Sequence, residues 1–284
     1  MRKKISPVKF IVHLAIRFRK DNIMAYAYTM TYSLLLSFFP FLIFLMTLVG
    51  YSDLDSSLIL PSLGSYLPDE VYTLVSEIVT EVLDHQRNGL MSFSGIFAAY
   101  AASGGFRSFM EASNRILGIK ERRNVIFRYI LSVFWVILLS IAIVFALLSI
   151  VFGQQILNLL YRYIPHSIDL FQIYRIIVPE IFIFLLFLSF YMFVPAQRIC
   201  FRCAIPGALL TTTAWIIFTM LFQIYVNTYA NYSRFYGTLG AVIILLLWLL
   251  FTSVIMLLGL ELNAILQELN IVKAPGNKDE TGSV

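Results

Sequence analysis

The sequence predicts an all-α, polytopic membrane protein with six transmembrane helices and short amphipathic helices at the membrane interface. Of its 284 residues, 60% are hydrophobic and 13% are charged, whereas about 25% of the residues of an ordinary soluble domain are charged. The mean hydropathy is +0.83. A soluble chain of this composition could not cover its surface with polar groups. The composition therefore argues against a soluble globular enzyme, a disordered protein and a disulfide-rich scaffold.

Six stretches between charged residues are long and apolar enough to cross a bilayer, which takes about 20 residues. Their uncharged runs hold between 19 and 33 residues, except that Glu180 interrupts the fourth. The second is the shortest and is rich in glycine and alanine, which favours an interior helix. Together they form one predicted membrane domain, 25–270. The predicted spans are 25–50, 88–106, 129–153, 176–195, 204–226 and 236–260.

Lys and Arg residues are concentrated in alternate loops. The N-terminal segment, the loops after the second and fourth spans and the C-terminal tail hold 17 of the 21. The positive-inside rule therefore predicts an inner-membrane or plasma-membrane protein with both termini in the cytoplasm. Because membrane topology explains the net charge of +5, we expect membrane lipids as partners and no nucleic acid. The sequence leaves a homo-oligomer open.

Three segments lie outside the predicted spans. Residues 1–24 form a basic amphipathic segment, which we expect on the cytoplasmic membrane surface. Residues 71–83 have apolar positions at helical spacing. This helix either packs on the bundle, which is the favoured alternative, or covers an outward-facing cavity. Residues 271–284 are polar and predict a disordered cytoplasmic tail.

Two shorter patterns carry local predictions. Residues 105–119 have an amphipathic pattern in which Arg107–Glu111 and Glu111–Arg115 are i,i+4 pairs of opposite charge. Cys200 and Cys203 form a lone CxxC, without the further ligands that a zinc site needs. We therefore expect reduced cysteines, no metal site and no cofactor.

Polar residues within the spans are the candidate pathway residues. Glu180 is the clearest charged residue inside a span, and such residues mark functional sites by default; a structural ion pair explains it equally well. Pro40 should kink or break the first span. Polar stripes of this kind more often make interhelical hydrogen bonds than line a substrate path. The polar stripe residues are Ser33 and Ser37 in the first span and Thr212, Thr219, Gln223 and Asn227 in the fifth.

Three segments together resemble the YihY/virulence factor BrkB family: Tyr32–Pro40, Gly105–Arg115 and Tyr232–Ala264. The resemblance covers about residues 20–270. It implies a six-span inner-membrane or plasma-membrane protein, linked in some members to serum resistance and lipid handling, without an established reaction. The motif positions that carry over are Pro40, Arg107, Asn114, Arg115, Tyr236, Gly237, Gly240, Glu261 and Asn263.

Three functional hypotheses follow, in order of preference. The first is a transporter or translocator of a lipid or amphiphilic solute of the cell envelope. The second is a structural or partner-binding membrane protein that transports nothing. The third is a ribonuclease, a label that family members have carried. It is the least favoured, because the sequence has no cytoplasmic cluster of carboxylates or histidines for a metal-dependent nuclease. We therefore do not expect an enzyme.

Overall fold

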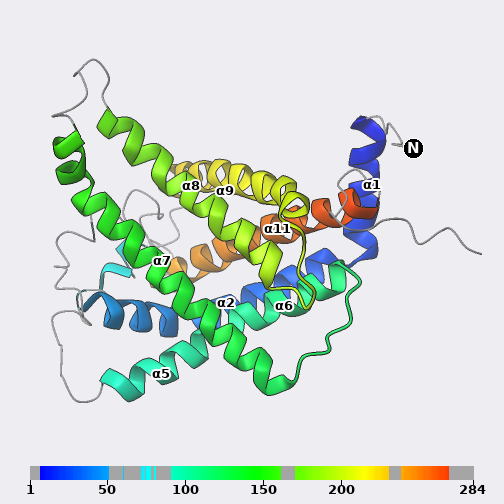
Figure 1. The fold of residues 1–284 in the computed structure, drawn as a ribbon, viewed down its shortest axis with the longest axis horizontal. Helices are drawn as coiled ribbons and strands as arrows, with labels where there is room; N and C mark the ends of the chain where they lie inside the picture. Colours follow the sequence, from blue (N-terminus) through cyan, green and yellow to red (C-terminus); the bar gives the residue numbers. More distant parts are fainter. Residues whose placement is uncertain are drawn as a thin grey trace, which may run out of the picture.

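The computed structural model describes residues 7–50, 91–160, 170–229 and 238–268, together with a few positions between residues 60 and 80. Helices make up nearly all of these four stretches, and Figure 1 shows them assembled as a bundle. The predicted disordered tail, 271–284, lies outside the described residues. The helices are α1 (Pro7–Lys20), α2 (Ile23–Gly50), α5 (Met91–Ala102), α6 (Gly104–Ile116), α7 (Val125–Leu160), α8 (Leu170–Phe193), α9 (Phe201–Tyr229) and α11 (Thr238–Glu268).

Within the part of the chain that the structure describes, four helices are long and apolar enough to cross a membrane, within α2, α7, α9 and α11. They correspond to the first, third, fifth and sixth predicted spans. Helix α8 covers most of the fourth, and its apolar part from Glu180 to Phe193 is shorter. The class of all-helical membrane protein is therefore confirmed, while the count of six spans stays a prediction.

The second predicted span, 88–106, is not one continuous helix. Ser103 interrupts it, so that α5 ends at Ala102 and α6 begins at Gly104. The glycines that follow lie directly against α2. A Cβ on Gly104 would be 2.9 Å from Ser37 Oγ, and a Cβ on Gly105 would be 2.5 Å from Leu34 Cδ2. The small residues thus serve a close approach of two helices, as the interior placement of this span predicts.

Pro40 does not break α2, which continues as a helix from Ile23 to Gly50. The prediction of a break is therefore wrong. Proline removes one backbone hydrogen bond from a helix, but neighbouring helices can support a membrane helix at such a point. Helix α2 packs against α5, α6 and α11, and these contacts hold it on several sides.

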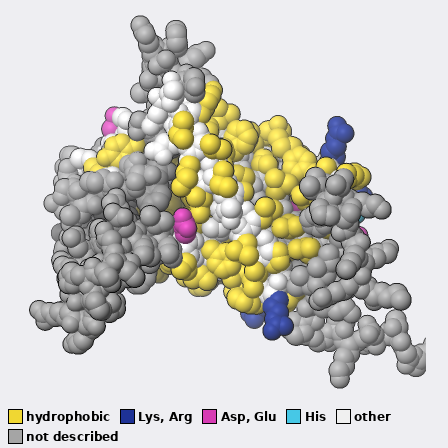
Figure 2. Space-filling model, turned by 90° about the horizontal axis from the view of Figure 1, so that it is seen from above, with side chains coloured by type: hydrophobic (Ala, Val, Ile, Leu, Met, Phe, Trp, Pro, Cys, Tyr) yellow, Lys and Arg dark blue, Asp and Glu magenta, His cyan; other side chains and the backbone are white. Residues whose placement is uncertain are grey.

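Two groups of buried apolar side chains form the core. The larger group includes Ile23 and Met30 at the start of α2, with Tyr191 and Leu257. The smaller group gathers around the later part of α2 and includes Val75. The burial of Val75 agrees, at this position, with the prediction that the helix 71–83 packs on the bundle. Most of that segment lies outside the described residues. Figure 2 shows a face on which hydrophobic side chains predominate and Lys and Arg lie at the margins.

Helices α9 and α11 cross with their backbones in contact at Gly207 and Gly259. A Cβ on Gly207 would be 2.2 Å from the Gly259 carbonyl oxygen, and a Cβ on Gly259 would be 1.9 Å from Thr211 Oγ1. Beside this crossing, Asn263 accepts the Gly207 N–H at 2.7 Å and donates to the Ala204 carbonyl at 3.3 Å. These bonds support the turn of α9 that Pro206 weakens.

Candidate functional site

A polar cavity of about 320 Å³ lies where α2, α6 and the start of α7 meet. Most of its walls are polar or charged, although apolar helices surround it. Ser33 comes from α2, and Arg128 and Tyr129 come from the first turns of α7. The lining residues are Ser33, Gly104, Arg107, Ser108, Glu111, Val125, Arg128 and Tyr129.

The serines of the first span hold the α5–α6 junction beside this cavity. Ser37 Oγ accepts the Gly105 N–H at 3.1 Å and donates to the Ala101 carbonyl at 3.3 Å. One turn away, Ser108 Oγ donates to Ser33 Oγ at 2.6 Å. Ser37 therefore satisfies backbone groups at the interruption, and Ser33 forms part of the cavity wall. This part of the predicted stripe serves both an interhelical contact and a cavity.

Arg107 lines the cavity beside two tyrosine rings, Tyr100 and Tyr129, that stack on each other. Its guanidinium carbon lies 4.4 Å from the centroid of the Tyr129 ring and 5.6 Å from that of Tyr100, close enough for cation–π attraction. Its Nη1 also donates to Ser103 Oγ. Among the described carboxylates, none lies within ion-pair distance of Arg107.

The predicted helical ion pairs of Glu111 with Arg107 and Arg115 are absent from the ion pairs of the described residues. That prediction is wrong because the Arg107 side chain turns toward the tyrosines and Ser103 instead. Glu111 and Arg115 are both exposed, and solvation of exposed charges leaves little net gain from pairing.

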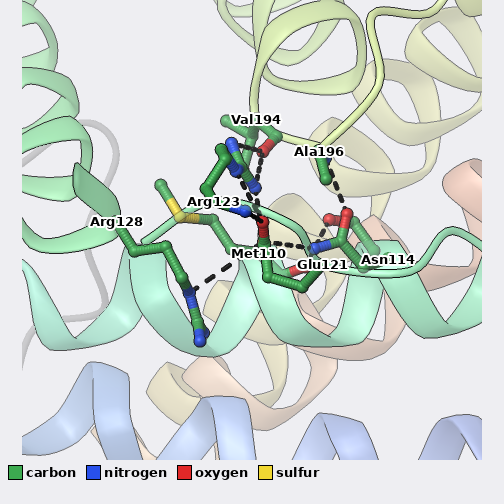
Figure 3. Close-up of polar contacts among 8 residues, drawn as sticks. Met110, Asn114, Glu121, Arg123, Arg128, Val194 and Ala196 are labelled. Carbon is green, nitrogen blue, oxygen red and sulfur yellow. Dashed lines mark hydrogen bonds and ion pairs between the residues drawn. The ribbon is translucent and has the colours of Figure 1, made fainter. Parts of the chain in front are cut away.

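Arg128 connects the cavity with a network centred on Glu121 (Figure 3). Its Nε lies 3.9 Å from Glu121 Oε2. The Glu121 carboxylate accepts hydrogen bonds from the Arg123 guanidinium at 2.7 and 2.9 Å and from Asn114 Nδ2 at 2.8 Å. Asn114 Oδ1 in turn accepts the Ala196 N–H at 2.7 Å. The network ties α6 and the start of α7 to the segment after α8.

Protonation of Glu121 should weaken this network. The Arg123 hydrogen bonds lower the pKa of Glu121 from 4.5 to about 2, against the opposing effect of partial burial. A lowered pKa stabilises the fold above pH 4.5, and this stabilisation is lost as the pH falls from 4.5 toward 2. We expect wild type to lose more stability between pH 6 and pH 3 than Glu121→Gln does, measured by thermal unfolding in detergent. An equal loss in both proteins would contradict this role.

The remaining motif positions lie in several places. Asn114 belongs to the Glu121 network, and Arg115 is exposed on α6. Glu261 is fully buried, and its Oε1 forms an ion pair with Arg17 Nε at 2.6 Å. Asn263 supports α9 at the helix crossing. Gly240 is buried near the start of α11, while Tyr236 and Gly237 lie outside the described residues.

The other predicted pathway residues do not line the cavity. Glu180 is exposed on α8, and its role as a pathway residue stays a prediction. On α9, Thr212 and Thr219 are buried, and their hydroxyls have no hydrogen-bond partner among the described residues. Gln223 is half-buried and Asn227 is exposed. The fifth-span stripe is therefore separate from the cavity on α2, α6 and α7.

Cys200 and Cys203 form a disulfide, which corrects the expectation of reduced cysteines. Their Cα atoms lie 5.2 Å apart at the beginning of α9, within the usual range for a disulfide. Spacing alone did not predict this bond. Among the residues that the structure describes, no group of three or more His, Cys, Asp or Glu side chains is placed to hold a metal ion.

Sequence reasoning missed three important residues of this region: Ser108, Arg128 and Tyr129. In the sequence, Arg128 is only one of the basic residues of the loop after the second predicted span. Tyr129 is only one residue of the third predicted span. A basic residue followed directly by an aromatic residue at the start of a span was the sequence feature that could have indicated a site here. Only the fold shows that this pair meets Arg107.

The long apolar helices, with a partly open polar cavity between α2, α6 and α7, are those of a polytopic helical membrane protein. The family model described as Virulence factor BrkB matches residues 14–282. The chain therefore belongs to the BrkB family, as the sequence motifs indicate.

Bacterial relatives span nearly the whole chain. The putative ribonuclease-like protein YfkH of Bacillus subtilis is 33% identical over 265 residues, which cover 92% of this chain and 96% of the relative. A UPF0761 membrane protein of Psychromonas ingrahamii is 26% identical, covering 89% and 85%. Another from Photobacterium profundum is 25% identical, covering 92% and 82%. No solved structure matches the chain.

Proposed function

We propose that the protein is a transporter or translocator that admits a lipid or amphiphilic solute at the α2/α6/α7 cavity. The observation that carries the proposal is a partly open cavity of about 320 Å³ with two arginines and two serines in its wall, between α2, α6 and α7 of a bundle with long apolar helices. Ionisable groups at such positions are costly in a membrane protein and commonly mark a substrate pathway.

The surroundings of the cavity favour an amphiphile over a small polar solute. Val125 lines the cavity and is 64% exposed, and Tyr32, next to Ser33 on α2, is 65% exposed. Tyr100, whose ring faces Arg107, is also exposed. An acyl chain lying along these side chains would stay in the hydrocarbon while its headgroup occupies the cavity. This placement satisfies both ends of an amphiphilic molecule.

Translocation is tested with the full-length protein in proteoliposomes that contain a fluorescent phospholipid and receive an impermeant quencher. We expect wild type to expose label from the inner leaflet. Arg107→Gln should lower the initial rate about tenfold or more, because losing a charged hydrogen-bonding group costs about 1.5–3 kcal/mol.

Two matched variants control for general effects of charge removal. Arg115→Gln changes an exposed arginine on the same helix, and Glu180→Gln changes the exposed carboxylate of α8. Both should translocate at the wild-type rate. If vesicles with wild type and vesicles without protein give the same rate, the proposal is wrong and a structural or partner-binding membrane protein is favoured instead.

A further inference from the structure

We propose that the α2/α6/α7 cavity binds a phosphodiester, the singly charged phosphate group of a membrane-lipid headgroup. This inference rests on the function proposed above, because it names the headgroup chemistry that the same cavity selects. The argument uses the two arginines, the serine pair, the charge of the cavity wall and its apolar surroundings.

Both arginines keep hydrogen-bonding capacity for a ligand. Arg107 uses one N–H group on Ser103 Oγ and otherwise faces tyrosine rings, whereas a guanidinium has five donors. Arg128 Nε is buried and approaches Glu121 at 3.9 Å, while the terminal N–H groups of Arg128 make no hydrogen bond among the described residues. The Glu121 oxygens already accept bonds from Arg123 and Asn114. A planar guanidinium fork matches the oxygens of a phosphate.

The serine pair supplies a neutral donor on the same wall. Ser108 donates its hydroxyl proton to Ser33 Oγ at 2.6 Å. Ser33 therefore retains its own proton for another acceptor. Both side chains line the cavity with Arg107, so a phosphate there has charged and neutral donors available together.

The charge of the wall favours a monoanion over a dianion. Arg107 and Arg128 contribute two positive charges and Glu111 contributes one negative charge, which leaves a net charge of +1. A phosphodiester carries one negative charge and matches this value. A phosphomonoester carries about −1.5 to −2 at pH 7, and Glu111 would repel the excess.

A lipid source fits this cavity better than free phosphate. The exposed apolar residue Val125 lines the cavity, and the exposed ring of Tyr100 lies beside Arg107. Free phosphate gains nothing from these side chains. A lipid can place its phosphate between the arginines and its glycerol and acyl chains along the exposed apolar surface.

Binding is tested by titrating the purified full-length protein, in a phosphate-free maltoside detergent, with short-chain phosphatidylglycerol. A diacylglycerol of the same chain length is the matched lipid without phosphate, and inorganic phosphate is the soluble probe. Calorimetry should detect phosphatidylglycerol at an affinity at least tenfold higher than that of either other compound. Arg107→Gln and Arg128→Gln should each weaken it about tenfold or more, while Arg115→Gln leaves it unchanged.

Two results would overturn the inference. Equal affinity for phosphatidylglycerol and diacylglycerol would show that the phosphate is not recognised. Tighter binding of inorganic phosphate would assign the cavity to a free anion. Arg107 also contacts two tyrosine rings, so Arg107→Gln could fail to fold. In that case the binding of phosphatidylglycerol by Arg128→Gln tests the inference. If both fold and bind lipid like wild type, the site lies elsewhere.

Glu111→Gln tests the charge argument separately. It should raise the affinity for inorganic phosphate several-fold and change the affinity for phosphatidylglycerol less. If the ratio of these two affinities is the same as in wild type, the cavity does not select a monoanion. The binding result is independent of transport. Translocation without phosphate-dependent binding would overturn this inference and leave the proposed function intact. Phosphate-dependent binding without translocation would support this inference and overturn the proposed function.

Discussion

Replacing Gly259 with alanine is expected to destabilise the protein by about 3 kcal/mol or more. The added Cβ would lie 1.9 Å from Thr211 Oγ1, 2.6 Å from the Tyr191 hydroxyl and 2.8 Å from the Gly207 carbonyl oxygen. Because one neighbour is the backbone of α9, relief requires the two helices to separate. Overpacking typically costs about 1–3 kcal/mol, and occasionally more where the surroundings cannot adjust.

Separation of the helices would also disturb hydrogen bonds. The Tyr191 hydroxyl donates to the Met256 carbonyl at 2.7 Å, and Asn263 accepts the Gly207 N–H at 2.7 Å. In an ordinary helix, replacing glycine with alanine stabilises the helix by about 0.5–1 kcal/mol. A decrease in the free energy of unfolding on Gly259→Ala would therefore indicate the close crossing. A stabilising Gly259→Ala would contradict the close crossing.

Unfolding in mixed detergent and SDS micelles measures this effect. Gly207→Ala should destabilise similarly, because its Cβ would lie 2.2 Å from the Gly259 carbonyl oxygen. The double variant should lose less stability than the sum of the losses in the two single variants, because either substitution already separates the same two helices. Leu209→Ala, which shortens an exposed side chain on α9, is the matched control and should have a small effect.

The arrangement of apolar residues predicted the class of fold well because the bilayer imposes a length on every spanning helix. Runs of uncharged residues thus located α2, α7, α9 and α11. The interruption at Ser103 was harder to predict because Ser103 keeps a helical backbone conformation. At this interruption Gly104 and Gly105 approach α2 closely, a tertiary contact that local sequence does not encode.

The candidate site was predictable only in part. Polar residues in the spans drew attention to Ser33 and Ser37, and the motif resemblance to Arg107. Glu180 was named for its place within a span, but depth in a span does not determine which side of a helix faces the bundle. Contacts between distant segments, such as Arg107 with Tyr129, depend on how α6 and α7 pack.

Removing Arg17 is expected to destabilise the protein by about 3–5 kcal/mol, the usual effect of breaking a buried ion pair. Arg17 Nε lies 2.6 Å from Glu261 Oε1, and the Glu261 side chain is fully buried. Arg17 also contacts Asp21 at 3.3 Å and Glu268. Arg17→Met would therefore leave three carboxylates close together without their shared cation. Their repulsion would act at the contact between α1 and α11.

A double-mutant cycle separates the pair from the rest of the cluster. Arg17→Met/Glu261→Leu should recover most of the stability lost in Arg17→Met, because it removes the buried charge together with its partner. Asp21 and Glu268 remain partly exposed, with 24% and 62% of their side-chain surface accessible, so solvent can stabilise them. Arg19→Met is the matched control, since Arg19 is an exposed arginine of the same helix.

The measurement is unfolding of wild type, Arg17→Met, Glu261→Leu, the double variant and Arg19→Met in detergent, together with limited proteolysis of α1. Arg17→Met should be cleaved in α1 much faster than wild type, Arg19→Met should be cleaved at the wild-type rate, and the double variant should regain protection. If the double variant is as unstable as Arg17→Met, the charge left on Glu261 is not the cause. Arg17 would then hold α1 to α11 through Asp21, Glu268 and the packing of its own side chain.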